Sequence, residues 1–162
     1  IRLIAGPHTW PNFPTIYYKQ PIEGDFEVQA KVTFPPPAAT ISAAQMVGLL
    51  VRPTNARLVE GNSSFPNDWV VAAKYLTDAG SLVGCRGSWA DYSLDTVYIK
   101  IERYNNVWRC AYGKNSENWT RLNVDVDDQA LNNKQLEIAL FAYSMTDDSI
   151  TVEFSDWLIT RR

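Results

Sequence analysis

The side chains in this sequence that could do chemistry are mainly aromatic rings and carboxylates. Histidine occurs once, as His8 in "GPHTWPNF", and no Gly-x-Ser-x-Gly turn that would present a serine nucleophile occurs. The two cysteines, Cys85 and Cys110, are far apart in the sequence, and with one histidine they do not make a zinc ligand set. The sequence therefore predicts neither a serine hydrolase triad nor a zinc site.

Two carboxylates near the end of the chain are the best candidates for glycoside hydrolysis. That reaction uses two carboxyl groups flanking the scissile bond, about 5 Å apart in retaining enzymes and about 6.5–9.5 Å apart in inverting ones. The segment "VEFSDW" offers Glu153 and Asp156, three positions apart. In a regular strand this odd spacing directs the side chains to opposite faces, unless a β-bulge intervenes. We therefore expect no catalytic residues and no enzymatic activity.

Two acidic turns are the only candidates for a cofactor or metal. Calcium takes carboxylate and carbonyl oxygens, which "DVDDQ" (Asp125, Asp127 and Asp128) and "TDDS" (Asp147 and Asp148) could supply. Solvated turn residues are the simpler interpretation of both segments. We expect no cofactor, with a structural calcium ion as the alternative.

Aromatic residues in loop-like segments favour a binding site. Sugars stack their C–H faces on exposed rings, while nearby carboxylate, amide and guanidinium groups bind their hydroxyls. Gly84 and Gly87 bracket Arg86, so we expect the strand to end there and Trp89 to lie beyond it. The predicted ligand-binding residues are Trp89, Arg86, Asp91 and Tyr92 in "CRGSWADYS" and Trp10 in "HTWPNF". Packing of these loops over the core is the alternative, as it is for Trp69.

The elements that must position these residues are short β-strands. In "GDFEVQAKVTF" apolar and polar residues alternate, as in a half-buried strand, whereas "QMVGLLVRP" and "DWVVAAKYL" are more uniformly apolar and typical of central strands. No segment shows a long apolar period of about 3.6 residues. The pattern predicts an all-β fold, an antiparallel β-sandwich of the jelly-roll type, in a single domain spanning residues 1–162.

One hairpin can be aligned in detail. Residues 105–106, both asparagine, suit a two-residue turn because asparagine tolerates positive φ. This alignment pairs Arg103 with Trp108 and separates an apolar face, which includes Cys110, from a charged one. We therefore place Cys110 in the core and Trp108 at its edge. Trp119, after the turn-rich "GKNSEN", is assigned to packing over the sandwich edge.

Composition limits the partners. Hydrophobic residues make up 46% and charged residues 20%, with a formal net charge of −3 and a pI of about 5.1. Nucleic acids and anionic membrane surfaces require clustered Lys and Arg, so neither is expected as a partner. No apolar run approaches the roughly 20 residues that span a bilayer. Because the chain begins at Ile1 rather than Met, we expect a piece of a longer protein, either a mature form or an excised domain. The excised domain is favoured because both ends resemble sandwich strands or their flanks.

The order and spacing of several motifs resemble a known family. They are "GDFEVQAKV", "QMVGLLVR", "DWVVAAKY", "VYIKIERYNNVWRCAYGKNSENWTRL", "LEIALFAYS" and "ITVEFSDWLI". Together they look like the bacterial domain-of-unknown-function family of concanavalin-A-like jelly rolls, similar to the accessory sandwich at the C-terminus of β-xylosidase-type enzymes. The resemblance covers roughly residues 5–160 and implies two curved antiparallel sheets in an extracytoplasmic or secreted, carbohydrate-linked setting.

The sequence departs from this family pattern at two places. Relatives commonly carry a Lys-Ala-Gly-Ile-Glu type segment, where this chain has "WVVAAKYL" with Lys74 and Tyr75 and no acid. Relatives also carry a Ser-Asp-Trp-Ser type loop, for which "GSWADYS" is the nearest match with Asp and Trp in altered order. Site residues of relatives are therefore not transferred to either segment.

These observations favour a non-catalytic carbohydrate-binding or accessory module whose partners are a glycan and the neighbouring domains of its parent chain. One alternative is a structural, protein-recognition or sensory sandwich without sugar binding. A glycoside hydrolase is a third, which the missing carboxylate pair disfavours. The two cysteines could pair or remain buried thiols.

Overall fold

The computed structural model describes residues 1–5, 15–17, 20–33, 45–54, 69–77, 80–85, 88–122, 131, 134–144 and 149–162, with the backbone alone at 15–17 and 77. The regular elements in this part of the chain are β-strands. They are β1 (Arg2–Ala5), β2 (Thr15–Tyr17), β3 (Phe26–Thr33), β4 (Gln45–Pro53), β5 (Val70–Thr77), β6 (Gly80–Cys85), β7 (Ser88–Asp91), β8 (Thr96–Tyr104), β9 (Val107–Gly113), β10 (Thr120–Leu122), β11 (Leu136–Ser144) and β12 (Ile150–Arg161).

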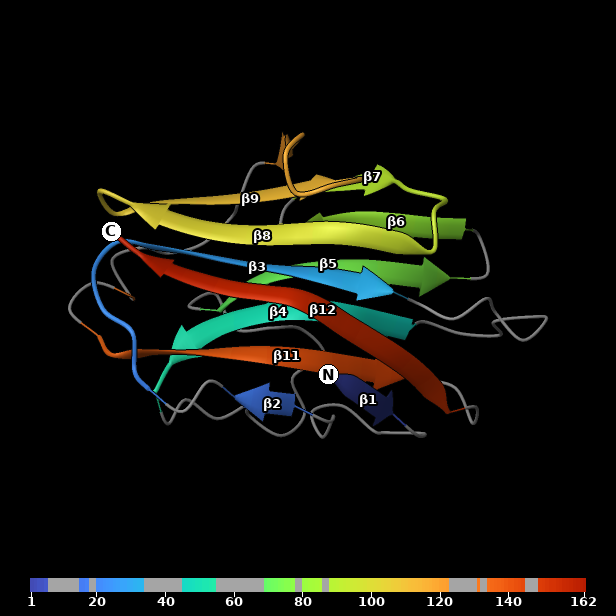
Figure 1. The fold of residues 1–162 in the computed structure, drawn as a ribbon, viewed down its shortest axis with the longest axis horizontal. Coiled ribbons are helices and arrows are strands. Elements are labelled where there is room, and N and C mark those ends of the chain that lie inside the picture. The colour runs from blue at the N-terminus through green and yellow to red at the C-terminus, as the bar shows by residue number, and fades with distance from the viewer. Residues whose placement is uncertain are drawn as a thin grey trace.

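The described strands form two sheets of six strands each, stacked face to face (Figure 1). The first sheet has the order β1-β12-β3-β8-β9-β10 and the second the order β2-β11-β4-β5-β6-β7, with antiparallel neighbours throughout. Strands from the two ends of the chain meet in the first sheet, where the ammonium group of Ile1 donates to the Phe154 carbonyl at 2.7 Å. The predicted antiparallel sandwich is confirmed.

Alternation along the strands of the first sheet builds the core. In β3, residues 26, 28, 30 and 32 are buried between the sheets, and the polar residues between them lie on the outer face, which is turned away from the second sheet. The pattern repeats along β8, whose residues 97, 99 and 101 are buried. Burial of this continuous apolar surface is the main favourable term in folding.

The predicted hairpin register is confirmed. Asn105 and Asn106 have φ of 50° and 59°, and Arg103 pairs with Trp108 across β8 and β9. Trp108 packs edge-on against Phe26 with ring centroids 5.7 Å apart, and the Arg103 guanidinium lies 5.6 Å from its ring. The turn therefore fixes which residues of both strands face the core.

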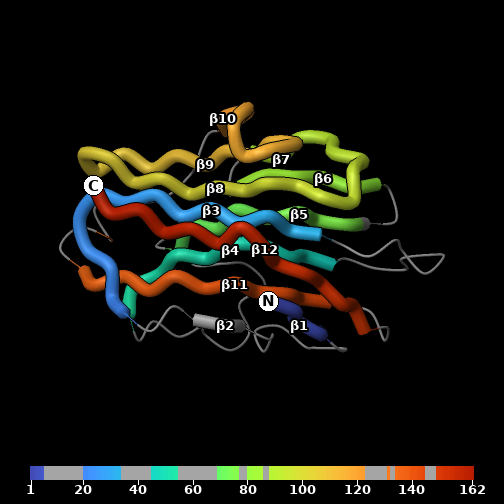
Figure 2. The backbone as a smooth tube through the Cα atoms, in the orientation of Figure 1, coloured from blue at the N-terminus to red at the C-terminus, as the bar shows by residue number. Residues whose placement is uncertain are grey.

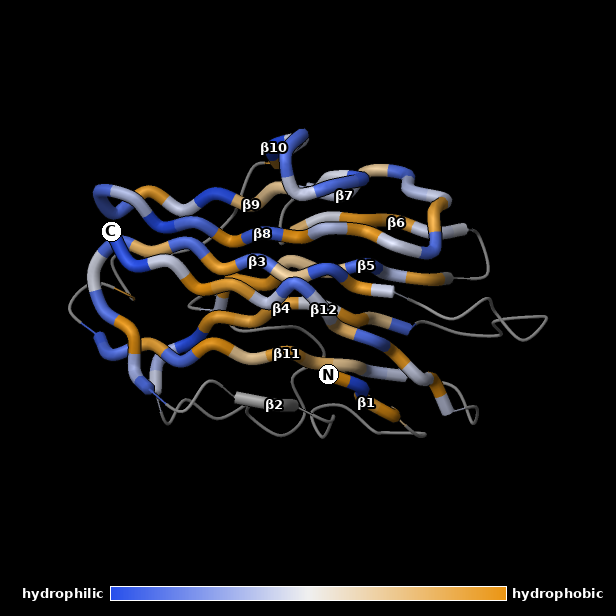
Figure 3. Tube along the Cα trace, viewed as in Figure 1, coloured by the Kyte–Doolittle hydropathy of each residue, from blue (hydrophilic) through white to orange (hydrophobic). Residues whose placement is uncertain are grey.

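The second sheet carries a buried apolar cluster on each of its faces. Its outer face carries a second buried cluster, separate from the core between the sheets, formed by Leu50, Trp69, Val71, Ala73, Ala139 and Phe141. This explains why the segments around β4 and β5 lack alternation, since a strand buried on both sides reads as a continuous apolar run. Figure 3 shows the long hydrophobic stretch along β4.

A β-bulge in β12 corrects the expectation about the two carboxylates. The pairing of β12 with β3 shifts between Ser155 and Leu158, and Asp156 has a φ of 50°. The extra residue reverses the alternation, so that Glu153 and Asp156 both lie exposed on the outer face of the first sheet. The expectation that they occupy opposite faces is therefore wrong, because the bulge inverts the parity of the strand.

Cys110 provides a test of the core on β9. Its side chain is 1% exposed, and burial, together with a hydrogen bond with the Cys85 thiol of the opposite sheet, raises the pKa of Cys110. We expect Cys110→Ser to lower the free energy of unfolding by about 1–3 kcal/mol, because it introduces a more strongly polar hydroxyl at an apolar site. Denaturant unfolding measures the change.

The matched control is Val107→Thr on the same strand, where the side chain is 49% exposed and a change within about 0.5 kcal/mol is expected. An unchanged denaturation midpoint for Cys110→Ser would contradict the buried placement of this thiol.

Candidate functional site

Trp89 lies on the outer face of the second sheet, at its β7 edge, with 41% of its surface exposed. Strand β6 ends at Cys85, as expected, but Trp89 does not lie in a loop beyond it: it stands within the next strand, β7, and pairs with Gly84 of β6. The cause is the register: Cys85 pairs with Ser88, so β7 runs back antiparallel along β6 as the next strand of the sheet. A Cβ added to Gly84 would lie 2.7 Å from Cε3 of Trp89, so the missing side chain lets the ring lie against the sheet.

Tyr75 and Asp91 lie on the same face as Trp89. The Tyr75 ring, on β5, is partly exposed, and its centroid is 5.8 Å from that of Trp89 at an interplanar angle of 53°. Asp91 is exposed and pairs with Leu82, which in turn pairs with Tyr75. We call these four residues, Trp89, Tyr75, Leu82 and Asp91, the Trp89 platform.

The platform combines aromatic and polar groups on an ordered surface. Two tilted rings present apolar faces on which the C–H side of a small ring can stack, and the Asp91 carboxylate can accept hydrogen bonds from hydroxyls. Because these side chains project from paired strands rather than from a free loop, the backbone positions that carry them are held by the sheet. This arrangement suits a flat ligand with hydroxyls at its edge.

Tyr92 does not join this surface. Alternation along the chain turns it inward, where it is 7% exposed and belongs to the core between the sheets. Its hydroxyl donates to the Thr96 carbonyl at 3.0 Å, and the buried Lys74 ammonium lies 5.9 Å from its ring. Lys74 itself donates to the Leu94 carbonyl, and desolvation by burial lowers its pKa, although Asp95 acts in the opposite direction. The expected convergence of Tyr92 with Trp89 is therefore not observed.

The remaining predicted residues divide into two groups. Arg86 and Trp10, like the acidic turns with Asp125, Asp127, Asp128, Asp147 and Asp148, lie outside the described residues. Trp69 is 1% exposed and packs under the Arg52 guanidinium, 4.8 Å from its ring, so its alternative assignment to packing is confirmed.

A pocket of about 260 Å³ lies on the outer face of the first sheet, and the sequence prediction missed it. We call it the Trp119 pocket; its walls include Lys100, Glu102, Arg109, Glu117, Trp119 and Arg121. The hairpin alignment had placed the charged members of β8 and β9 on the outer face. The sequence signal that could have indicated the pocket was Trp119, which directly follows a turn that leads back to those strands.

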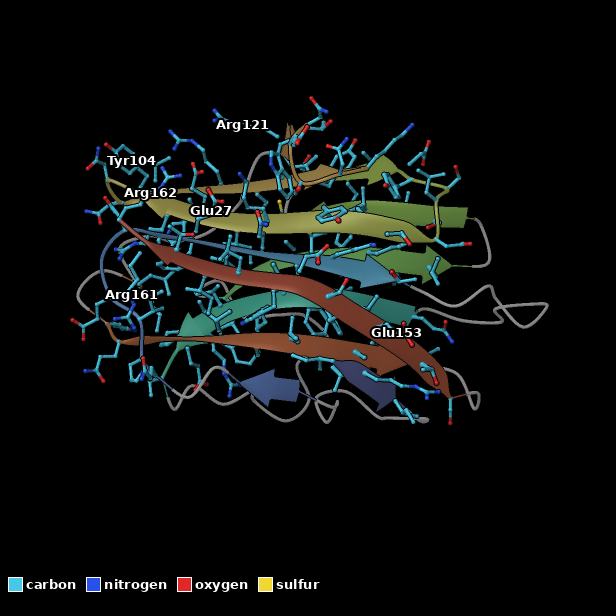
Figure 4. The ribbon with its side chains drawn as sticks, in the orientation of Figure 1. Glu27, Tyr104, Arg121, Glu153, Arg161 and Arg162 are labelled. Atoms are coloured by element: carbon cyan, nitrogen blue, oxygen red, sulfur yellow. The ribbon has the colours of Figure 1, made fainter. Side chains whose placement is uncertain are left out.

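The two carboxylates of β12 do not form part of this pocket. Asp156 accepts a hydrogen bond of 2.7 Å from the Tyr98 hydroxyl, and this bond raises the pKa of Tyr98. In Figure 4, Glu153 lies toward the opposite end of the sheet from Glu27 and Arg162. Both carboxylates are exposed, whereas the acid of a glycosidase is usually buried enough to stay protonated.

In the described part of the chain, no group of three or more His, Cys, Asp or Glu side chains is arranged to hold a metal ion. Nor does this part of the chain contain a helix of sufficient length and apolar character to cross a membrane.

No family model and no curated protein sequence matches this chain. Solved structures match it with low sequence identity. A functionally unknown protein from Saccharomyces cerevisiae is 14% identical with a TM-score of 0.63, over 93% of this chain and 74% of that one. A xylan β-1,4-xylosidase from Bacillus halodurans is 12% identical with a TM-score of 0.67, over 99% of this chain and 32% of the enzyme.

A lectin has the same architecture over nearly its whole length. Lectin II from Ulex europaeus is 9% identical with a TM-score of 0.63, over 98% of this chain and 92% of the lectin. The fold is a concanavalin-A-like jelly roll. At these identities the likeness shows the fold, and this chain spans about a third of the length of the xylosidase.

We expect no release of reducing sugar from β-glucans or xylans, because neither of the two β12 carboxylates is buried in the way that the acid of a glycosidase usually is. A reducing-sugar assay with purified protein tests this. Turnover that Glu153→Gln abolishes, and that the exposed control Glu23→Gln preserves, would contradict the expectation.

Proposed function

We propose that this chain is a non-catalytic carbohydrate-binding sandwich domain that holds a glycan against Trp89. The observation that carries the proposal is the Trp89 ring itself, 41% exposed at a sheet edge, set over Gly84 and beside Tyr75. Contiguous exposed apolar patches often mark binding sites, and here the Tyr75 ring adjoins the Trp89 ring on one face of the sheet.

The fold and the motif resemblance support the same proposal. Jelly rolls of this architecture occur as a lectin and as part of a xylosidase among the similar structures. The sequence also resembles the bacterial accessory jelly rolls that stand beside glycoside hydrolases. In this proposal the chain binds a neutral glycan in an extracytoplasmic setting and is attached to further domains of its parent protein.

A glycan array followed by titration calorimetry tests the function. Reproducible binding of a neutral glycan at millimolar concentration or below supports it. The absence of binding to any glycan would favour the alternative of a structural or protein-recognition sandwich.

Substitution of Trp89 tests the assigned surface. We expect Trp89→Ala to change the free energy of unfolding by less than about 1 kcal/mol, because an exposed ring contributes little to the core, and to abolish binding of any neutral glycan found on the array. Thermal or denaturant unfolding and calorimetry provide the two measurements.

Two controls separate binding from folding. Tyr104→Ala removes an aromatic ring of nearly equal exposure, 42%, from the first sheet and is expected to preserve glycan binding. Trp108→Ala removes a buried ring and is expected to cost about 3–5 kcal/mol. A comparable loss of stability for Trp89→Ala, or retained glycan binding, would show that Trp89 serves the fold rather than a ligand.

A further inference from the structure

The Trp119 pocket is built on three neighbouring strands of the first sheet. Lys100 on β8 pairs with Ala111 on β9, which pairs with Arg121 on β10. All three side chains project outward, and the alanine separates the two cations. Because neighbouring strands lie about 4.8 Å apart, the backbones that carry Lys100 and Arg121 are about 10 Å apart, with only a methyl group between them. Figure 2 shows β10 at this edge of the sheet.

Trp119 forms an ordered wall of the pocket. Its Nε1 donates to the Ser116 carbonyl at 3.0 Å, and the preceding turn is held by the Asn115 side chain, which accepts from the backbone N–H of residues 117 and 118. A Cβ at Gly113 would lie 2.3 Å from the Asn118 carbonyl oxygen, so the turn can cross the sheet at this point only over a glycine. The wall is therefore in place before any ligand binds.

Lys100 is held in position by two contacts. Its ammonium lies 4.4 Å from the centre of the Trp119 ring and 3.4 Å from the Glu27 carboxylate. The same carboxylate also bonds Arg162 at 3.1 Å, so it is shared between two cations. An ammonium has three N–H donors, and a further acceptor in the pocket can use one of them.

Two charged side chains of the pocket have no ion pair among the described residues. Arg109 is paired with Glu102 at 3.1 Å, but neither the Arg121 guanidinium nor the Glu117 carboxylate has such a partner. In total the pocket carries three cationic and two anionic side chains, an excess of one positive charge. In Figure 4, Arg121 lies at the edge of the first sheet, apart from the ion pairs of Glu27 and Arg162.

We propose that the Trp119 pocket is a second binding site, for a small carboxylate that also carries hydroxyls, the chemistry of a uronic acid. The carboxylate lies between the Lys100 ammonium and the Arg121 guanidinium and accepts hydrogen bonds from both, since a guanidinium fork matches a carboxylate. The ligand's hydroxyls donate to Glu117. At about 260 Å³ the pocket is smaller than the roughly 300–1,000 Å³ of sites for drug-sized ligands, which suits one sugar ring.

The mixed charge of the pocket decides between ligand classes. A neutral sugar would bring no anion to Arg121, which has no ion pair with the described residues, and a bare inorganic anion or acetate would leave Glu117 facing a negative charge with no hydroxyl to bind. A carboxylate with hydroxyls satisfies both groups. This site lies on the opposite sheet from the Trp89 platform and does not depend on the proposed neutral-glycan function.

Titration calorimetry of the whole chain with glucuronate, glucose and acetate tests the proposal. We expect glucuronate to bind at least about tenfold more tightly than glucose or acetate, and binding to weaken with added salt, because a charge-assisted bond is involved. Equal binding of acetate would overturn the requirement for hydroxyls. Equal binding of glucose would overturn the requirement for a carboxylate. No glucuronate binding would overturn the site.

Variants of equal charge change locate the site. Arg121→Gln is expected to weaken glucuronate binding at least about tenfold, whereas Arg161→Gln, which removes the same charge from exposed β12, is expected to stay within about twofold. Equal losses in both would show a general effect of net charge and overturn the proposal. Trp89→Ala is expected to leave glucuronate binding intact, so a failure of the neutral-glycan function and a failure of this site give different results.

Discussion

Packing of the apolar face of one sheet against that of the other is the interaction on which the remaining structure depends. A strand contributes to this core only through every second residue, and the bulge in β12 shifts that alternation so that Phe154 before it and Ile159 after it both pack against the core. The side chains left over form the outer faces, where the candidate sites lie. The core thus determines which residues are available to a ligand.

The two outer faces differ in character for a physical reason. The second sheet buries a further apolar cluster around Leu50 and Phe141, and its solvent-exposed aromatic surface lies toward the β7 edge at Trp89. The outer face of the first sheet instead carries linked ion pairs, in which Glu27 and Glu102 are shared by several cations. This difference in character is the basis for proposing a neutral, stacking ligand on one face and a charged ligand on the other.

Glycines allow both sites to form close to the backbone. At Gly84 a side chain would collide with the Trp89 ring, and at Gly113 one would collide with the turn that carries Trp119. At Gly84 the Trp89 ring itself lies against the backbone, and at Gly113 the turn that precedes Trp119 does. A glycine that permits close approach to the backbone thus supports each of the two surfaces, which share no residues.

Local patterns in the sequence determined the strands, the hairpin turn and the core. Alternation around Val28 and Ile99, and two asparagines that accept positive φ, are read from neighbouring residues alone. The alternation along β9 also placed Cys110 correctly in the core.

The sequence could not show that β12 contains a bulge, because that depends on its pairing with β3, and it therefore misplaced Asp156 relative to Glu153. Tertiary structure likewise decided that Trp89 stands inside a paired strand and that Tyr92 turns into the core. The hairpin register already pairs Lys100 with Ala111, but only the pairing of β10 with β9 adds Arg121 to that row, because contacts across a sheet are set by register and not by distance along the chain.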